Sequence, residues 1–188
     1  MKIKSNASPD ELSSPYYEMN ENFCRAFESY IATKNGKVRG SYNAWSYFAQ
    51  GKIEAKRKWN ITYKKSVFTS SGNLFMSSKK QSLLVLAEWK TNIPGTRSSN
   101  FVLRRRRRSD FFRKQIDRSI YVLDYRKQYT LETTIGQPEL AFKILKLLTP
   151  LLHSGEIYRI EHLEHELNVE LRSELHHFDL LDSLIADL

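Results

Sequence analysis

Hydrophobic residues recur at helical spacing near the amino terminus. Apolar positions fall three and four residues apart between Tyr16 and Ile31, and Asn35-Gly36 follows as a stop signal. The pattern predicts a helix over about 15–33, with Cys24 on or beside its apolar side. The preceding residues 1–14 are polar and contain Pro9, which favours a flexible amino-terminal arm.

Between about 38 and 134 the pattern changes to short runs of aromatic and β-branched residues divided by glycine and serine. In Ile53–Tyr63 the odd positions are apolar except Arg57, and the even positions are polar, as in an antiparallel strand with one solvated face. The spacing favours a meander. Further strands are predicted at 39–48, 66–69, 73–76, 82–89, 101–103, 119–125 and 128–134, with a short helix capped by Ser109 among them.

The last third changes character again. Pro138 suits the first position of a helix, and its apolar stripe continues to Leu151, with Pro150 expected to kink or restart it. Segments 157–163 and 167–171 fit a hairpin, although intervals of three between apolar residues in the first segment also fit a helix. A stripe from Phe178 to Leu188 predicts a terminal helix.

These elements together predict an α+β fold. The sheet is largely antiparallel and spans about 38–134, with an N-terminal helix and C-terminal helices packed on one face. The 188 residues fit a single domain, which we expect over 15–188 after the arm at 1–14.

Several classes of protein are excluded because the sequence lacks the residues or segments that they require. The single cysteine excludes an internal disulfide framework and a four-cysteine zinc site. The amino terminus has no apolar signal segment, and no apolar run approaches the roughly 20 residues that a spanning helix needs. We therefore expect a soluble cytoplasmic protein with no stable membrane insertion.

Charge is unevenly distributed along the chain. The formal net charge is +9, with a pI near 9.6. Residues 34–127 hold 23 Lys and Arg against 5 Asp and Glu, whereas residues 128–188 hold 4 against 11. Two interpretations follow. The acidic third packs beside the basic middle and neutralises part of it, or the two signs face outward, which favours head-to-tail association or leaves a basic patch free for an anionic partner.

The sharpest local feature is the arginine run Arg104–Arg108. Alternate arginines of a strand point to opposite faces, so we expect the strand to project past the sheet or to lie at an edge, where charges block unwanted pairing. The alternative is binding of nucleic acid or another polyanion, because guanidinium groups make bidentate contacts with phosphate. The candidate residues for that role are Arg104, Arg105, Arg106, Arg107, Arg108, Arg113, Lys114, Lys56, Arg57 and Lys58. Aromatic residues offer stacking surfaces if they are exposed, although most are expected in the core: Tyr42, Trp45, Tyr47, Trp59 and Tyr63.

Motifs for catalysis and metal binding are scarce. The sequence contains none of the patterns G-x-x-x-x-G-K-[ST], G-x-G-x-x-G and G-x-S-x-G. The segment rich in His and Glu, 161–177, does not match zinc-ligand spacing and is expected to form a solvated acidic face, so we expect no metal and no cofactor. We expect the Cys24 thiol to be inert.

The leading functional hypothesis is therefore a non-catalytic interaction or scaffold domain. Its partner would be an unknown protein or a second copy of the chain. The alternative is nonspecific nucleic-acid or polyanion binding through the arginine run, and an enzyme of unknown class comes third.

Overall fold

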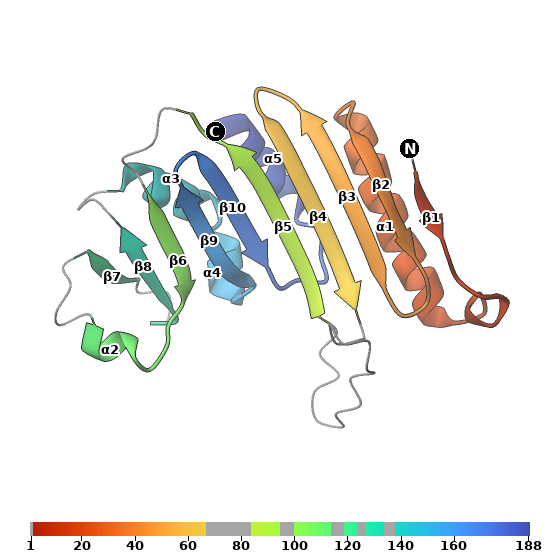
Figure 1. Ribbon diagram of the computed structural model, residues 1–188, viewed down its shortest axis with the longest axis horizontal. Helices are drawn as coiled ribbons and strands as arrows, with labels where there is room; N and C mark the ends of the chain where they lie inside the picture. Colours follow the sequence, from red (N-terminus) through yellow and green to blue (C-terminus); the bar gives the residue numbers. More distant parts are fainter. Residues whose placement is uncertain (1, 67–83, 95–99, 114–118, 124–126, 134–137) are drawn as a thin grey trace. The chain divides into compact units, whose positions relative to one another are not determined.

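The protein is described by a computed structural model that covers residues 2–66, 84–94, 100–113, 119–123, 127–133 and 138–188. Its ten strands form a mostly antiparallel sheet in the order β1-β2-β3-β4-β5-β10-β9-β6-β8-β7 (Figure 1), and the fold belongs to the α+β class, as predicted. The chain divides into two compact units. Unit 1 comprises Met1–Glu88 and Arg172–His176, and unit 2 comprises Trp89–Leu171 and His177–Leu188.

The helices and strands follow in chain order. Unit 1 contains β1 (Ile3–Ser5), the 3-10 helix η1 (Pro9–Glu11), α1 (Pro15–Thr33), β2 (Lys37–Tyr42), β3 (Tyr47–Glu54), β4 (Lys58–Ser66) and the first half of β5 (Leu84–Asn92). Unit 2 contains the rest of β5, β6 (Phe101–Arg105), α2 (Asp110–Arg113), β7 (Ile120–Leu123), β8 (Tyr129–Thr133), α3 (Glu139–Leu147), α4 (Thr149–Ser154), β9 (Ile157–Leu163), β10 (Glu166–Leu171) and α5 (Phe178–Asp187).

The predicted first helix is confirmed as α1. The Ser14 hydroxyl accepts a hydrogen bond from the backbone N–H of Tyr16, which caps the helix amino terminus. The buried face of α1 packs on β2 and β3, and Gly51 permits this close approach, since a Cβ there would lie 2.5 Å from Cδ1 of Ile31. Within the stretch expected to be a flexible arm, Ile3 is buried and β1 pairs in parallel with β2.

Two predicted strands of unit 1 are wrong because each contains a turn. Residues 39–48 divide between β2 and β3, since the Asn43 side-chain oxygen accepts hydrogen bonds from the backbone N–H groups of Trp45 and Ser46, at 2.9 Å each. Residues 53–63 divide between β3 and β4. The odd–even alternation survives this turn because directly opposite residues share a face, and Ile53 opposes Trp59.

The remaining strand predictions fall into two groups. The predicted strands 66–69 and 73–76 lie outside the described residues, apart from Ser66 at the end of β4, and segment 82–89 corresponds to β5. The predictions at 119–125 and 128–134 are confirmed as β7 and β8.

In unit 2 the hairpin of β9 and β10 is confirmed, and the helical alternative for 157–163 is wrong. This hairpin lies between β5 and β6, so the sheet extends beyond the predicted range of 38–134 and is not a simple meander. Pro150 restarts the predicted core helix as α4, which ends at Gly155 in the left-handed conformation (φ 76°). Figure 1 shows α3, α4 and α5 on one side of β9 and β10. Within the described ranges, no helix is long and apolar enough to cross a membrane.

Candidate anion-binding site

The arginine run divides where β6 ends. Arg104 and Arg105 belong to β6, and Arg106–Arg108 follow it as a loop that leads to α2. Arg106–Arg108 therefore lie past the end of the sheet, as one of the two expectations had it, whereas Arg104 and Arg105 are paired within the sheet. The edge-protecting alternative is wrong, because β6 pairs with β8 along its length and with β9 from Phe101 to Arg104.

Arg104 is held by two carboxylates within unit 2. Its guanidinium donates a bidentate pair of hydrogen bonds to Asp110, at 2.7 and 2.8 Å, and a further bond of 2.5 Å to Glu132. The side chains of Arg104 and Asp110 are only 16% and 2% exposed. The bond to Asp110 raises the pKa of Arg104 above its ordinary value, and Glu132 adds to the rise while burial opposes it. We conclude that Arg104 stabilises the fold.

Asp110 also fixes the loop of arginines. Its carboxylate accepts a 2.6 Å hydrogen bond from the backbone N–H of Arg107, and its own N–H donates to the Arg107 carbonyl at 3.1 Å. The backbone N–H of Arg106 donates to the carbonyl of Gln128 at 2.7 Å. Hydrogen bonds to Asp110 and Gln128 thus fix the loop, and the Asp110 carboxylate is already bonded to Arg104 and to the Arg107 N–H.

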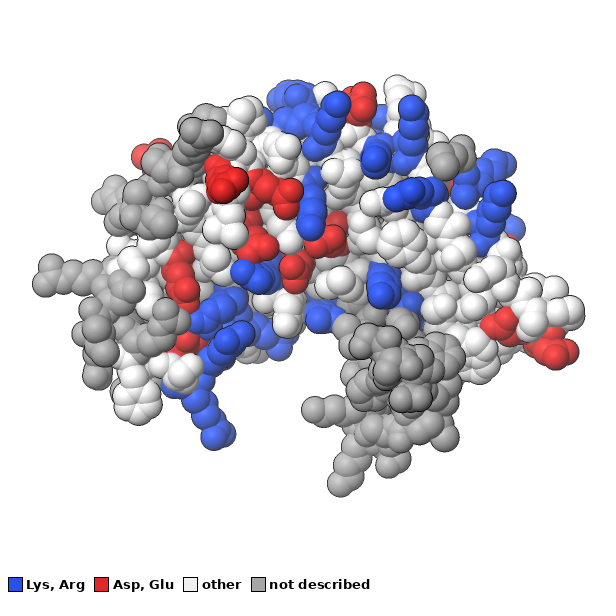
Figure 2. All heavy atoms as spheres, in the orientation of Figure 1, with Lys and Arg blue, Asp and Glu red and all other residues white. Residues whose placement is uncertain are grey.

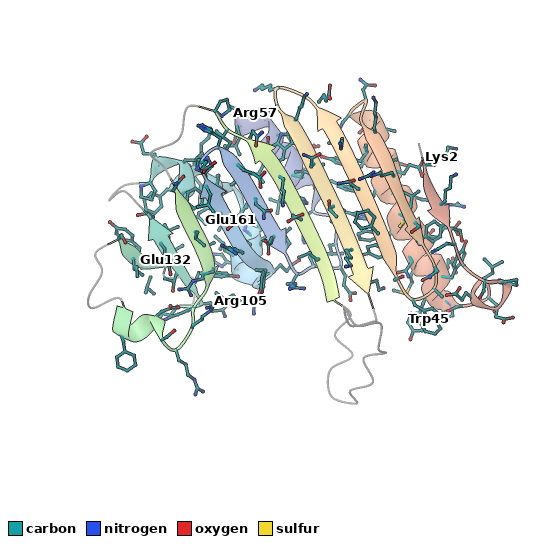
Figure 3. The ribbon with its side chains drawn as sticks, viewed as in Figure 1. Lys2, Trp45, Arg57, Arg105, Glu132 and Glu161 are labelled. Atoms are coloured by element: carbon teal, nitrogen blue, oxygen red, sulfur yellow. The ribbon has the colours of Figure 1, made fainter. Side chains whose placement is uncertain are left out.

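A cationic pocket lies beside this loop. It has a volume of about 550 Å³ and is lined by Arg105, Arg106, Arg107, Arg108, Lys127 and Gln128. Five of these six side chains carry a positive charge, and none is acidic. Figure 3 shows Arg105 extending from the end of β6, and its guanidinium donates to the carbonyl of Gly155. Clustered guanidinium and ammonium groups around an open depression are suited to bind phosphate oxygens.

The other predicted site residues lie elsewhere. Lys56 and Arg57 lie in the turn between β3 and β4 in unit 1, and Lys58 is the first residue of β4, whereas every lining residue of the pocket belongs to unit 2. Arg113 is the last residue of α2, with a side chain outside the described part, and Lys114 is not described. Of the five aromatic residues considered for stacking, Trp45 is 48% exposed and the others are buried.

Sequence reasoning missed Lys127 and Gln128, which contribute to the pocket. They follow β7 and lie beside the arginines because β8 pairs with β6, with Tyr129 opposite Arg105. The signal available in the sequence was weak, since Lys127 was one of many cations in the basic middle.

The cysteine and two of the histidines are engaged in packing or in contacts with other side chains. Burial, with a smaller contribution from Glu28, raises the pKa of the Cys24 thiol to about 12, which opposes a nucleophilic role near neutral pH. His162 is buried and stacks near Phe101, and His177 contacts Glu156 at 2.6 Å. Among the residues that the structure describes, no group of three or more His, Cys, Asp and Glu is placed to hold a metal ion.

Comparison with known proteins gives no independent indication of function. No family model matches the chain, and no curated protein matches it either.

Proposed function

We propose that the protein is a non-catalytic binding module for a phosphate-bearing polyanion, and that the pocket formed by Arg105–Arg108 and Lys127 is its anion site. The observation that carries this proposal is the lining of the pocket, which contains five cationic residues and no carboxylate. The different surroundings of the arginines support it. Asp110 and Glu132 form ion pairs with Arg104, which does not line the pocket, whereas Arg105–Arg108 do.

The same lining argues against proton-transfer chemistry. The lining residues include no histidine, aspartate or glutamate, the side chains that most often act as general acids or bases. Binding accords better with these side chains than catalysis does. Association with a protein partner or a second copy of the chain stays a prediction.

The test replaces the loop arginines and spares Arg104. The triple variant Arg106→Gln, Arg107→Gln, Arg108→Gln keeps the backbone hydrogen bonds of the loop to Asp110 and Gln128, and it keeps the ion pairs of Arg104. Arg105 is left unchanged because its guanidinium donates to Gly155. The matched control is Lys146→Gln, which removes an exposed cation from α3 of the same unit.

Binding would be measured by fluorescence anisotropy with a labelled single-stranded oligonucleotide, dT12, between 50 and 300 mM NaCl. The slope of log K against log salt is negative, and each lost phosphate contact reduces its magnitude by about 0.7 for a single strand. The triple variant is therefore expected to reduce the magnitude by about 2. Elution from phosphocellulose should also shift to lower salt. Slopes equal to that of the parent protein in both the triple variant and Lys146→Gln would refute the proposed function.

A further inference from the structure

Unit 1 has a sheet face that no described helix covers and that carries a surplus of cations. The packing of α1 against Gly51 identifies the covered face, and the outward residues alternate with it along β1–β4. Figure 2 shows Lys and Arg side chains spread over β2, β3 and β4 on the side away from α1. The outward side chains that form this surface, called here the basic sheet face, are Lys4, Lys37, Arg39, Phe48, Lys52, Lys58 and Lys64.

The cations are close to one another. Lys37 lies directly opposite Lys52 in the pairing of β2 with β3. Outward residues are about 7 Å apart along a strand and about 5 Å apart between strands. Like charges directly opposite each other destabilise a sheet. At the outward positions of β1–β4 in the described residues, Glu54 is the one carboxylate, and it opposes Lys58 at the strand end.

Protection of a sheet edge does not explain these charges. Lys52 lies on β3, which pairs with β2 and β4, and Lys64 lies on β4, which has β3 and β5 as neighbours. Charged residues discourage unwanted pairing only on strands with a free side. The charges of Lys52 and Lys64 on these inner strands are better explained by an anionic ligand.

An exposed aromatic residue lies among these cations. Phe48 is 40% exposed and shares a cross-strand row with Lys4, Ser41 and Lys64. Trp45, in the turn just before β3, is 48% exposed. Proteins that bind single-stranded nucleic acid combine cations that follow the backbone with aromatic rings on which bases stack. A duplex keeps its base faces stacked, so it would not use Phe48 in this way.

We propose that the basic sheet face of unit 1 binds single-stranded nucleic acid, with Phe48 stacking on a base and Arg39, Lys52 and Lys64 contacting phosphates. This inference extends the proposed function by naming the class of polyanion, and it rests on that function for the ligand being anionic. It uses residues of unit 1 that do not contribute to the pocket. Arg39 keeps its charge for this role, because its side-chain partner is the neutral amide of Gln50.

The experiment compares three variants of the full chain. Phe48→Leu removes the ring and retains an apolar side chain. Lys52→Gln with Lys64→Gln removes two cations from the face. Arg25→Gln is the matched control, since Arg25 lies on α1 with a side chain that is 71% exposed. Binding is measured with labelled dT12 and with a labelled 12-base-pair duplex, and urea unfolding verifies that each variant folds.

Phe48→Leu should weaken dT12 binding by about 5- to 150-fold, because stacking contributes about 1–3 kcal/mol per base, and it should leave duplex binding unchanged. The double lysine variant should reduce the magnitude of the slope of log K against log salt for dT12 by about 1.4. Arg25→Gln should change neither quantity.

Unchanged dT12 binding in Phe48→Leu would overturn the inference, as would an equal loss for dT12 and duplex. If only the pocket variant weakens binding, the sheet-face inference fails and the proposed function stands. If neither variant weakens it, both fail. Weakened binding of the lysine variant to phosphatidylserine vesicles, with dT12 binding unchanged, would assign the face to a membrane and also overturn the inference.

Discussion

Arg104 and Arg107 are neighbours in one run of arginines, yet we expect opposite consequences from replacing them. Arg104→Gln removes the cation that Asp110 and Glu132 share. Asp110 would retain a buried carboxylate with the Arg107 N–H as a donor. Arg107→Gln changes an exposed side chain and keeps that backbone bond.

The magnitude follows from burial. Removing one partner of a buried ion pair costs about 3–5 kcal/mol, and solvent screening at a partly exposed partner reduces that cost. The side chains of Arg104 and Glu132 are 16% and 29% exposed, whereas that of Asp110 is 2% exposed. We therefore expect Arg104→Gln to lower the free energy of unfolding by about 2–4 kcal/mol. At about 2–4 °C per kcal/mol for a chain of this size, Tm should fall by about 4–16 °C.

The assay is urea unfolding followed by circular dichroism, with thermal unfolding as a second measure. Arg107→Gln should lie within about 0.5 kcal/mol of the parent protein. In addition, Arg104→Gln and Asp110→Asn should show a coupling free energy in the double variant, because each removes the same contact. Equal stability of Arg104→Gln and Arg107→Gln, or the absence of such coupling, would refute the structural role of Arg104.

Three further predictions concern unit 1. Gly51→Ala should destabilise the fold by about 1–3 kcal/mol in urea unfolding, because the new Cβ would lie 2.5–2.8 Å from Ile31 and Phe27 side-chain atoms; parental stability would contradict the packing of α1. Tyr63→Phe should cost about 1 kcal/mol, since its hydroxyl donates a 2.6 Å hydrogen bond to the carbonyl of His176, and a neutral effect would deny that bond a stabilising role. Burial raises the pKa of Cys24 from 9.0 to about 12, so its stabilising contribution is complete below pH 9 and is lost as pH rises toward 12. The urea midpoint should fall over this range less in Cys24→Ala than in the parent protein, and an identical fall would contradict this linkage.

Helices and the alternation of strand faces were predictable because they depend on local spacing. The periods of three and four residues located α1 and α5, and the odd–even pattern of 53–63 gave the correct buried face. The turns were missed because the hydrogen bonds that form them involve only a few atoms, such as the Asn43 side chain among aromatic neighbours. In 53–63 the turn also preserved the alternation and so left no break in the pattern.

The order of the strands was not predictable from spacing. Insertion of the β9–β10 hairpin between β5 and β6 depends on contacts between residues far apart in the chain, such as Phe101 opposite His162. This pairing also decides that β6 is an inner strand. It therefore removes the edge-protecting explanation of the arginine run, which sequence alone favoured.

The candidate sites were predictable only in part, because a charge in the sequence does not reveal its partner. The run itself stood out, but the separation of Arg104 from the loop arginines depends on Glu132, which lies 28 residues further on. The basic sheet face was predictable in part, since Lys58 was among the candidate residues. Lys52, Lys58 and Lys64 occupy even positions on the solvated side of the predicted strand region, and Glu54 is the acid among the outward positions from 52 to 64.

The acidic third of the chain neutralises particular cations of unit 2 and leaves others exposed. Glu132 contacts Arg104 at 2.5 Å, so part of the charge of the basic middle is balanced inside the unit. The loop arginines line the pocket instead. A variant that replaces the whole run would combine a loss of stability at Arg104 with a loss of ligand contacts at Arg106–Arg108. Because the two effects would be inseparable in a binding assay, keeping Arg104 is the condition under which reduced polyanion binding can be attributed to the pocket.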